Sequence, residues 1–246
     1  MADKLAFEGV VLDIEGTVCP ISFVKDILFP YALTALDTIL STSWSSPAFT
    51  PYRDAFPSKH RQNPTAFRTH IHSLVARDVK SAPLKNLQGY LWLSGYQNGS
   101  LSCPLFPDVK TAFKSWTEAG IPIVIYSSGS VAAQKLLFKY TDSKDGEKDL
   151  TGYIKEYFDT VNAGMKGESE SYRKIVEGMR SGKGEGGSVV DVEIGKWLFC
   201  SDRVEEVDAA REAGMQAVVV VREGNAKLSD SERERCVLID SFDQIA

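Results

Sequence analysis

The sequence predicts an α/β fold built on a doubly wound parallel sheet, with a helical insertion after the first strand. Several short apolar runs do not alternate with polar residues, which is typical of strands buried on both faces of a parallel sheet. From residue 105 onward such runs alternate with stretches of helical spacing, as a doubly wound sheet requires. Residues 18–102 show helical spacing without a clear strand. We therefore expect an α/β core formed by 1–17 and 103–246, and a helical cap formed by 18–102.

Composition sets limits on the class of protein. The chain has 246 residues, 43% hydrophobic and 25% charged, so it can bury a sizeable core. A net charge of -5 argues against a general nucleic-acid or membrane-surface binder, which would need a basic patch. The longest apolar run, 217–221, is too short to span a bilayer, and charged residues before the first strand predict no signal segment. Four scattered cysteines without a CxxC pair indicate reduced thiols in the cytosol.

The first predicted strand, 9–12, ends at two acidic residues and a glycine turn. If the extended backbone continues for two more residues, Asp13 and Glu15 point to the same side, because strand side chains repeat every second residue. Two like charges that close repel each other unless a cation or a shared proton intervenes. A hard divalent ion such as Mg²⁺ suits oxygen ligands and bridges to phosphate. The alternative is a pair of solvated acids in a turn.

The region after this turn changes from strand to helix. Apolar residues recur at helical spacing over 21–40, where Pro30 should break or kink the helix. Residues 41–57 are rich in Ser, Pro and Thr, which predicts a connecting loop. Two further helices are predicted over 66–79 and 84–95.

A second polar strand end follows the predicted strand 121–126. Ser127 and Ser128 come directly after it, and a helix begins at 131. Two hydroxyls, a glycine and a helix N-terminus together favour an anion. The alternative is a plain turn with a helix cap.

The third polar strand end carries a lysine. A short strand is predicted over 157–161 and a helix over 168–179, with Lys166 between them. A cation gains nothing from the dipole at the entrance of a helix, so a negatively charged ligand would explain it; the alternative is a solvated lysine. The glycine-rich stretch 181–188 is predicted to be a flexible surface loop and not a dinucleotide cradle.

The fourth strand end is again acidic. A buried strand is predicted over 197–200, followed by Asp202 and a helix over 203–213. A further strand is expected over 217–221. The remaining tail is expected to be a polar loop with one terminal element around 237–239.

The four strand ends lie at equivalent positions of the predicted fold, where the ligand crevice of an open α/β sheet is found. Carboxylates suit Mg²⁺, while hydroxyls and an ammonium suit phosphoryl oxygens, so these groups favour phosphoryl transfer. The sequence lacks a Walker A motif, so a carboxylate must serve as nucleophile if a covalent intermediate forms.

These motifs resemble those of the haloacid dehalogenase superfamily, which has an Asp strand end, a Ser/Thr strand end, a Lys and a second acidic strand end. Within it, the chain resembles the enolase-phosphatase family of methionine salvage, also called acireductone synthases. Glu15 is a distinguishing mark, because most phosphatases of the superfamily have Asp there. The segments that carry the resemblance span nearly the whole chain: Asp13–Thr17, Phe23–Tyr31, Tyr126–Ser130, Ala133–Phe138, Glu168–Ile175 and Val219–Ala226.

The resemblance implies a reaction. The substrate would be 2,3-diketo-5-methylthiopentyl-1-phosphate, which is enolised and then dephosphorylated to the acireductone, a dihydroxy-keto-methylthiopentene. Asp13 would attack phosphorus and Glu15 would shuttle a proton. One Mg²⁺ per subunit would be bound by Asp13, Glu15 and Asp202, and the substrate by Ser127, Ser128 and Lys166.

Two other functions compete with this one. A simple phosphatase of the same superfamily would release phosphate from another small ester without enolisation, and the cap would decide between the two. A non-catalytic binding protein is the second alternative, but the nucleophile and the other acids are present. We expect a monomer that binds a small phosphorylated diketone and neither nucleic acid nor membrane. We also expect it in the cytoplasm, with nuclear presence left open.

Overall fold

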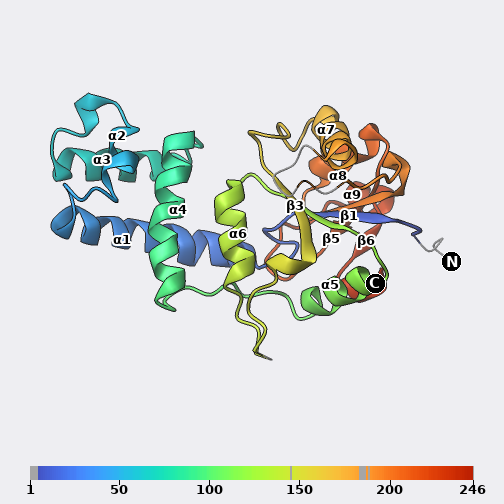
Figure 1. Cartoon of the computed structure of the whole chain (residues 1–246). Coiled ribbons are helices and arrows are strands. Elements are labelled where there is room, and N and C mark those ends of the chain that lie inside the picture. Colours follow the sequence, from blue (N-terminus) through green and yellow to red (C-terminus); the bar gives the residue numbers. More distant parts are fainter. Residues whose placement is uncertain (1–4, 145, 183–186, 188, 246) are drawn as a thin grey trace. The chain divides into compact units, whose positions relative to one another are not determined.

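The computed structural model describes residues 5–144, 146–182, 187 and 189–245. The chain forms two compact units, which meet in sequence at Ile21/Ser22 and at Ser102/Cys103; we call the outer pair of segments the core and the inner one the cap (Figure 1). The first boundary comes four residues later than the sequence predicted. Val18 and Cys19 form hydrogen bonds within the core, because their carbonyls accept from Phe106 (3.0 Å) and Gly16 (2.7 Å).

The core contains a parallel sheet of six strands in the order β3-β2-β1-β4-β5-β6. The predicted α/β fold with a parallel sheet is therefore confirmed. The first strand lies at its centre, between strands that come from distant segments. Ligands bind at such a position in open α/β sheets, because the strand order reverses there: β2 and β3 extend the sheet on one side of β1, and β4, β5 and β6 extend it on the other. The strands are β1 (Gly9–Leu12), β2 (Ile123–Tyr126), β3 (Ile154–Phe158), β4 (Trp197–Ser201), β5 (Gln216–Val220) and β6 (Leu238–Ile239).

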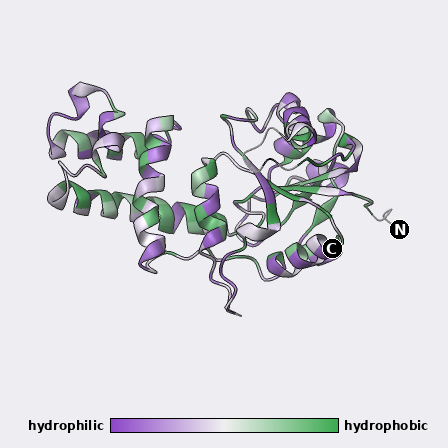
Figure 2. Cartoon of the chain, viewed as in Figure 1, coloured by the Kyte–Doolittle hydropathy of each residue, from purple (hydrophilic) through white to green (hydrophobic). Residues whose placement is uncertain are grey.

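Strand residues that point to either face of the sheet are apolar, so helices cover both faces. Val11 of β1 and Phe199 of β4 belong to a buried cluster with residues of α7 (Ser169–Ser181) and α8 (Val204–Ala213). The other helices of the core are α5 (Val109–Glu118), α6 (Val131–Lys139) and α9 (Asp230–Arg235), with short η3 (Thr151–Tyr153), η4 (Ile194–Lys196) and η5 (Phe242–Gln244). Figure 2 shows hydrophobic strands inside and hydrophilic outer sides on α5 and α7.

Two parts of the core differ from the sequence prediction. Strand β3 begins at Ile154 and ends at Phe158, whereas 157–161 was predicted. It is an edge strand on which Lys155 is exposed, so its residues do not form a continuous apolar run. Helix α7 ends at Ser181, with Gly182 in the left-handed conformation (φ 62°). Most of the predicted glycine-rich loop, residues 183–186 and 188, lies outside the described residues.

The cap is helical, and no strand occurs between residues 22 and 102. A π-helix, η1 (Phe23–Leu28), leads into α1 (Phe29–Thr42), where Pro30 occupies the first turn. The predicted break at Pro30 does not occur, because Leu28 and Phe29 before it keep right-handed helical angles; Pro30 lies where the π-helix changes to an α-helix. The predicted loop 41–57 contains a short helix. The other cap elements are α2 (Thr50–Asp54), η2 (Ser58–His60), α3 (Pro64–Ala76) and α4 (Ala82–Gln97).

Aromatic packing holds the cap helices together. Phe49 and Phe67 are fully buried, and their rings meet edge to face at 6.0 Å. The Trp92 indole donates a hydrogen bond to the carbonyl of Leu28 at 2.8 Å, which ties α4 to the end of η1. No described helix combines the length and the apolar character that crossing a bilayer would need.

Candidate active site

Asp13 lies at the end of the central strand and is 5% exposed. Its backbone N–H donates to the Cys200 carbonyl of β4 at 3.0 Å. The chain then turns sharply, because the Ile14 carbonyl accepts hydrogen bonds from the N–H groups of residues 17, 18 and 19. The Thr17 hydroxyl points back to the Asp13 carboxylate, 3.5 Å from Oδ2. The ladder on one side and the turn on the other hold this carboxylate in place.

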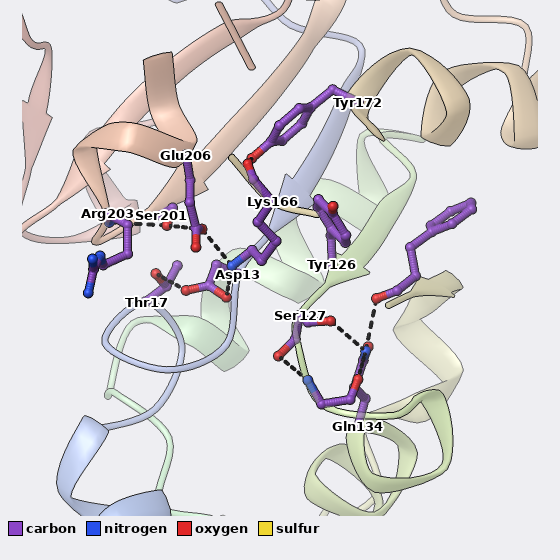
Figure 3. A network of polar contacts seen from close by, with 12 residues as sticks. Asp13, Thr17, Tyr126, Ser127, Gln134, Lys166, Tyr172, Ser201, Arg203 and Glu206 are labelled. Carbon is purple, nitrogen blue, oxygen red and sulfur yellow. Dashed lines mark hydrogen bonds and ion pairs between the residues drawn. The ribbon is translucent and has the colours of Figure 1, made fainter. Parts of the chain in front are cut away.

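Lys166 meets the Asp13 carboxylate directly. Its Nζ lies 2.5 Å from Asp13 Oδ1 and 2.5 Å from Glu206 Oε2 (Figure 3). The Tyr172 hydroxyl donates to the Lys166 carbonyl at 2.7 Å and so fixes the lysine backbone. Burial alone lowers the pKa of this ammonium, but the Asp13 and Glu206 carboxylates raise it above its ordinary value. Lys166 is therefore a fixed positive charge, and the solvated alternative for it is wrong.

Glu206 is the site residue that the sequence prediction did not include. It follows Asp202 by one turn at the start of α8, and this spacing is the signal that could have identified it. The Ser201 hydroxyl donates to Glu206 Oε2 at 2.8 Å and accepts from the Arg203 N–H at 3.1 Å. Burial raises the pKa of Glu206, an effect that the nearby Lys166 charge opposes. Glu206 thus couples the end of β4 to the lysine.

Asp202 lies at the end of β4, beside the turn that follows Asp13. A Cβ atom built on Gly16 would lie only 2.9 Å from Asp202 Oδ2, so glycine is required for this close approach. Burial, together with the Asp13 and Glu206 charges, raises the pKa of Asp202 to about 7. The Asn225 amide donates to the Gly16 carbonyl at 2.9 Å, and its Oδ1 atom is buried without a hydrogen-bond partner among the described residues.

The two predicted serines lie at the end of β2, which pairs with β1. Leu12 and Ile125 are partners in the ladder, and Ser127 follows two positions later. Ser127 is 5% exposed, and its N–H donates to the Phe158 carbonyl at 3.1 Å, while Ser128 is half-buried. Asp13 and the two serines therefore lie at the carboxyl ends of neighbouring parallel strands, on the same side of the sheet.

The prediction for Glu15 assumed that the extended backbone continues beyond Asp13, and the structure differs on this point. Strand β1 ends at Leu12 and the chain bends at Ile14, so alternation along a strand does not orient the Glu15 side chain. Glu15 is half-buried and forms an isolated bridge with Cys19. Within the described ranges, no three His, Cys, Asp or Glu side chains converge as a preformed metal cluster. The roles of Asp13, Glu15 and Asp202 as metal ligands stay predictions.

Comparison with known proteins identifies the family. The model of the haloacid dehalogenase-like hydrolases matches residues 7–214. The chain is 54% identical to enolase-phosphatase E1 of Sclerotinia sclerotiorum, over 100% of this chain and 96% of that protein. It is 53% identical to enolase-phosphatase E1 of Podospora anserina, over 96% of each.

Solved structures share the fold of this chain. The crystal structure of the UTR4 protein of Saccharomyces cerevisiae matches with a TM-score of 0.82 and 35% identity, over 96% of this chain and 98% of that one. CbbY of Rhodobacter sphaeroides in complex with phosphate, at 15% identity and a TM-score of 0.60, shares the fold; 96% of this chain and 95% of that one are covered.

Proposed function

The chain belongs to the enolase-phosphatase family of the haloacid dehalogenase-like hydrolases, and we propose that it converts 2,3-diketo-5-methylthiopentyl-1-phosphate to the acireductone and phosphate. Enolisation would come first and phosphate hydrolysis second, as a step of methionine salvage. The identity of the relatives over the full chain supports the substrate, and the strand-end cluster supports the chemistry.

The observation that carries the proposal is the contact of Lys166 with both Asp13 and Glu206. The Lys166 ammonium holds one oxygen of the Asp13 carboxylate in a fixed position, as an oriented nucleophile requires. The same positive charge attracts the phosphoryl group of a substrate and opposes the negative charge that grows during transfer. A role in fold stability alone would not explain why a lysine lies at the carboxyl ends of the strands, where ligands bind in open α/β sheets.

The residues present fit Mg²⁺, which we propose as the cofactor, one ion per subunit. Asp13 and Asp202 supply carboxylate oxygens, and the missing side chain of Gly16 lets the Asp202 carboxylate pack closely against the turn that follows Asp13. Mg²⁺ is usually bound by only one or two carboxylates and keeps several waters, so a preformed cluster of three acids is not needed. When bound, the ion would neutralise charge on phosphoryl and enolate oxygens.

The side chains of this site can divide the work between them. An Asp13 carboxylate oxygen would attack phosphorus, and the bond between phosphorus and the substrate oxygen would break. Glu15, the neighbouring carboxyl group, would give its proton to the leaving oxygen and then take one from the water that releases phosphate. Ser127, Ser128 and Lys166 would bind the phosphoryl oxygens and orient them for attack.

One assay tests the proposal against its rivals. The protein is mixed with the diketo phosphate and Mg²⁺, and both free phosphate and the ultraviolet absorbance of the enediol are followed. We expect both signals, and we expect a chelator to remove both. Phosphate without enediol absorbance would identify a simple phosphatase of the superfamily. Neither signal from a folded protein would favour a binding protein that only kept the fold.

Two further parts of the proposal concern the state of the protein in the cell. We propose a monomer, which size-exclusion chromatography with light scattering can check. We also propose a cytoplasmic location, with nuclear presence to be decided by imaging of a tagged chain. The cysteines, at positions 19, 103, 200 and 236, are all free thiols, which is the form that the cytosol maintains.

A further inference from the structure

Gln134 is a buried polar residue of α6 that the proposed mechanism does not use. Its side chain is 1% exposed. The amide nitrogen Nε2 lies 2.8 Å from the Gly129 carbonyl, 2.9 Å from the Phe158 carbonyl and 3.5 Å from the Ser127 carbonyl. The Gln134 side chain thus connects two carbonyls of the turn after β2 with the carbonyl at the end of β3 (Figure 3).

The other atom of the amide makes the arrangement unusual. Gln134 Oε1 is buried and has no hydrogen-bond partner among the described residues. A buried acceptor without a partner destabilises the folded state. An apolar side chain at a position between helix and sheet would avoid this cost. The two hydrogens of Nε2 must therefore serve a purpose that an apolar residue could not serve.

That purpose follows from peptide geometry. In a trans peptide the C=O and the following N–H point in opposite directions, and the described chain contains no cis peptide. The Ser127 and Gly129 carbonyls point inward to Gln134. Hence the N–H groups of Ser128 and Ser130, which belong to the same two peptide units, point outward from the buried amide. Outward-pointing amides just before a helix form a site that suits an anion.

Asp159 supports the same turn from β3. Its Oδ2 accepts from the Val131 N–H at 3.1 Å, and its Oδ1 accepts from the Val161 N–H at 2.8 Å. The first N–H of α6 is therefore already occupied by a protein carboxylate. An incoming phosphate would have to bind the N–H groups that precede Val131. These are the N–H groups of Ser128 and Ser130, which Gln134 orients.

We propose that Gln134 is a positioning residue for phosphate binding: its amide holds two carbonyls of the turn inward, so that the N–H groups of Ser128 and Ser130 face the phosphate of the substrate. This inference rests on the proposed phosphatase function. Gln134 itself touches no substrate atom, and it acts through the backbone of the turn.

The test compares two isosteric substitutions in the Mg²⁺-loaded protein. Gln134→Met keeps the length of the side chain and removes its donors. Thr141→Val is the matched control, because the Thr141 hydroxyl is fully buried and donates to the Lys148 carbonyl at 2.8 Å, away from the turn. Titration calorimetry measures the affinity for inorganic phosphate, and steady-state kinetics measures KM and kcat for the diketo phosphate.

We expect Gln134→Met to weaken phosphate binding about tenfold. A loss of this size corresponds to the net free energy of about one hydrogen bond. KM should rise by more than kcat falls, and Thr141→Val should leave both the affinity and KM within about twofold of the wild type. Should Gln134→Met not fold, Gln134→Glu replaces it, and at least the same loss is expected because a carboxylate repels the inward carbonyls.

The outcomes are distinct. Phosphate affinity of the Gln134 variant within about twofold of the wild type would overturn the inference, as would an equal loss in Thr141→Val. A wild-type protein that binds phosphate but leaves the diketo phosphate unchanged would overturn the proposed substrate, while the comparison of phosphate affinities would still decide the role of Gln134.

Discussion

Asp13 and Lys166 are 153 positions apart in the chain, and their side chains meet at 2.5 Å. They form a buried ion pair at the carboxyl end of the inner strand β1. The pair joins the end of the first strand to the segment before α7. Glu206, on α8, and Asp202, just after β4, surround this pair and determine how it responds to substitution.

Asp13→Asn should lower turnover by about 10³-fold or more, because an amide has neither the charge nor the nucleophilicity of a carboxylate. The volume hardly changes and Lys166 keeps Glu206 as a partner, so circular dichroism should show an intact fold. Phosphate release per enzyme is the measurement. A variant with more than about a tenth of the wild-type rate would show that Asp13 is not the nucleophile.

Glu206→Gln should lower kcat by about 10- to 100-fold, since Lys166 would lose one of its two carboxylate partners and with it part of its orientation. The matched control is Glu205→Gln on the same helix, because Glu205 is exposed and pairs with Arg203. That control should keep nearly the full rate. Equal rates for the two variants would remove Glu206 from the site.

Asp202 should make the metal-free protein less stable as the pH rises. Its pKa is raised to about 7 in the folded state from an ordinary value of 3.8. The folded state therefore holds this proton more tightly than the unfolded state does. The stability it contributes is complete below about pH 4 and is lost as the pH rises through about 7.

Asp202→Asn should therefore increase the free energy of unfolding at pH 8 by about 2 to 4 kcal/mol in the presence of a chelator, and have a smaller effect at pH 5. Addition of Mg²⁺ should raise the melting temperature of the wild type and not that of the variant. Denaturant unfolding at both pH values is the measurement. An unfolding free energy that does not rise in the variant at pH 8 would contradict the assignment.

Gly16→Ala should abolish activity, because a Cβ there would lie 2.7 Å from Asn225 Oδ1 and 2.9 Å from Asp202 Oδ2. Gly224→Ala separates this contact from backbone strain. Gly224 also has a positive φ of 89°, but nothing lies within 4 Å of its Cβ position. Both variants should lose about 1 kcal/mol of stability from strain, and only the first should lose turnover. Loss of turnover in both would point to strain alone.

Asp108→Ala should reduce the free energy of unfolding by about 3 to 5 kcal/mol, because it leaves the buried Arg222 without its charge partner. The two groups lie 2.7 Å apart, and their side chains are 7% and 6% exposed. The comparison variant is Asp208→Ala, whose exposed pair with Arg235 should be worth less than about 1 kcal/mol. Chemical denaturation measures both. Similar losses would show that burial is not what matters.

The sequence predicted the parts of the site that follow fully buried strands. The ends of β1, β2 and β4 are clear because apolar runs stop abruptly at polar residues, and Asp13, Ser127 and Asp202 were predicted as site residues on this basis. Lys166 was predicted as a site residue from its place just before a helix. The start of β3 was placed three residues late, because exposed Lys155 on an edge strand interrupts the apolar pattern.

Other features depend on tertiary contacts that a linear pattern does not contain. Glu206 has the helical spacing of an ordinary surface acid, and only its contact with Lys166 makes it part of the site. The sharp turn at Ile14 likewise removes the strand geometry assumed for Glu15. Gln134 was predicted simply as part of a helix, because the carbonyls that it binds come from two other segments.

The central place of β1 has a consequence for biosynthesis. Its two partners, β2 and β4, begin at Ile123 and Trp197, so the strand made first has no neighbour on one edge until the chain has been made as far as β4. A nascent chain that has produced β2 but not β4 carries Asp13 next to an open edge. Such non-local pairing slows folding and exposes intermediates to aggregation. The ribosome must therefore deliver most of the protein before any catalytic centre can exist.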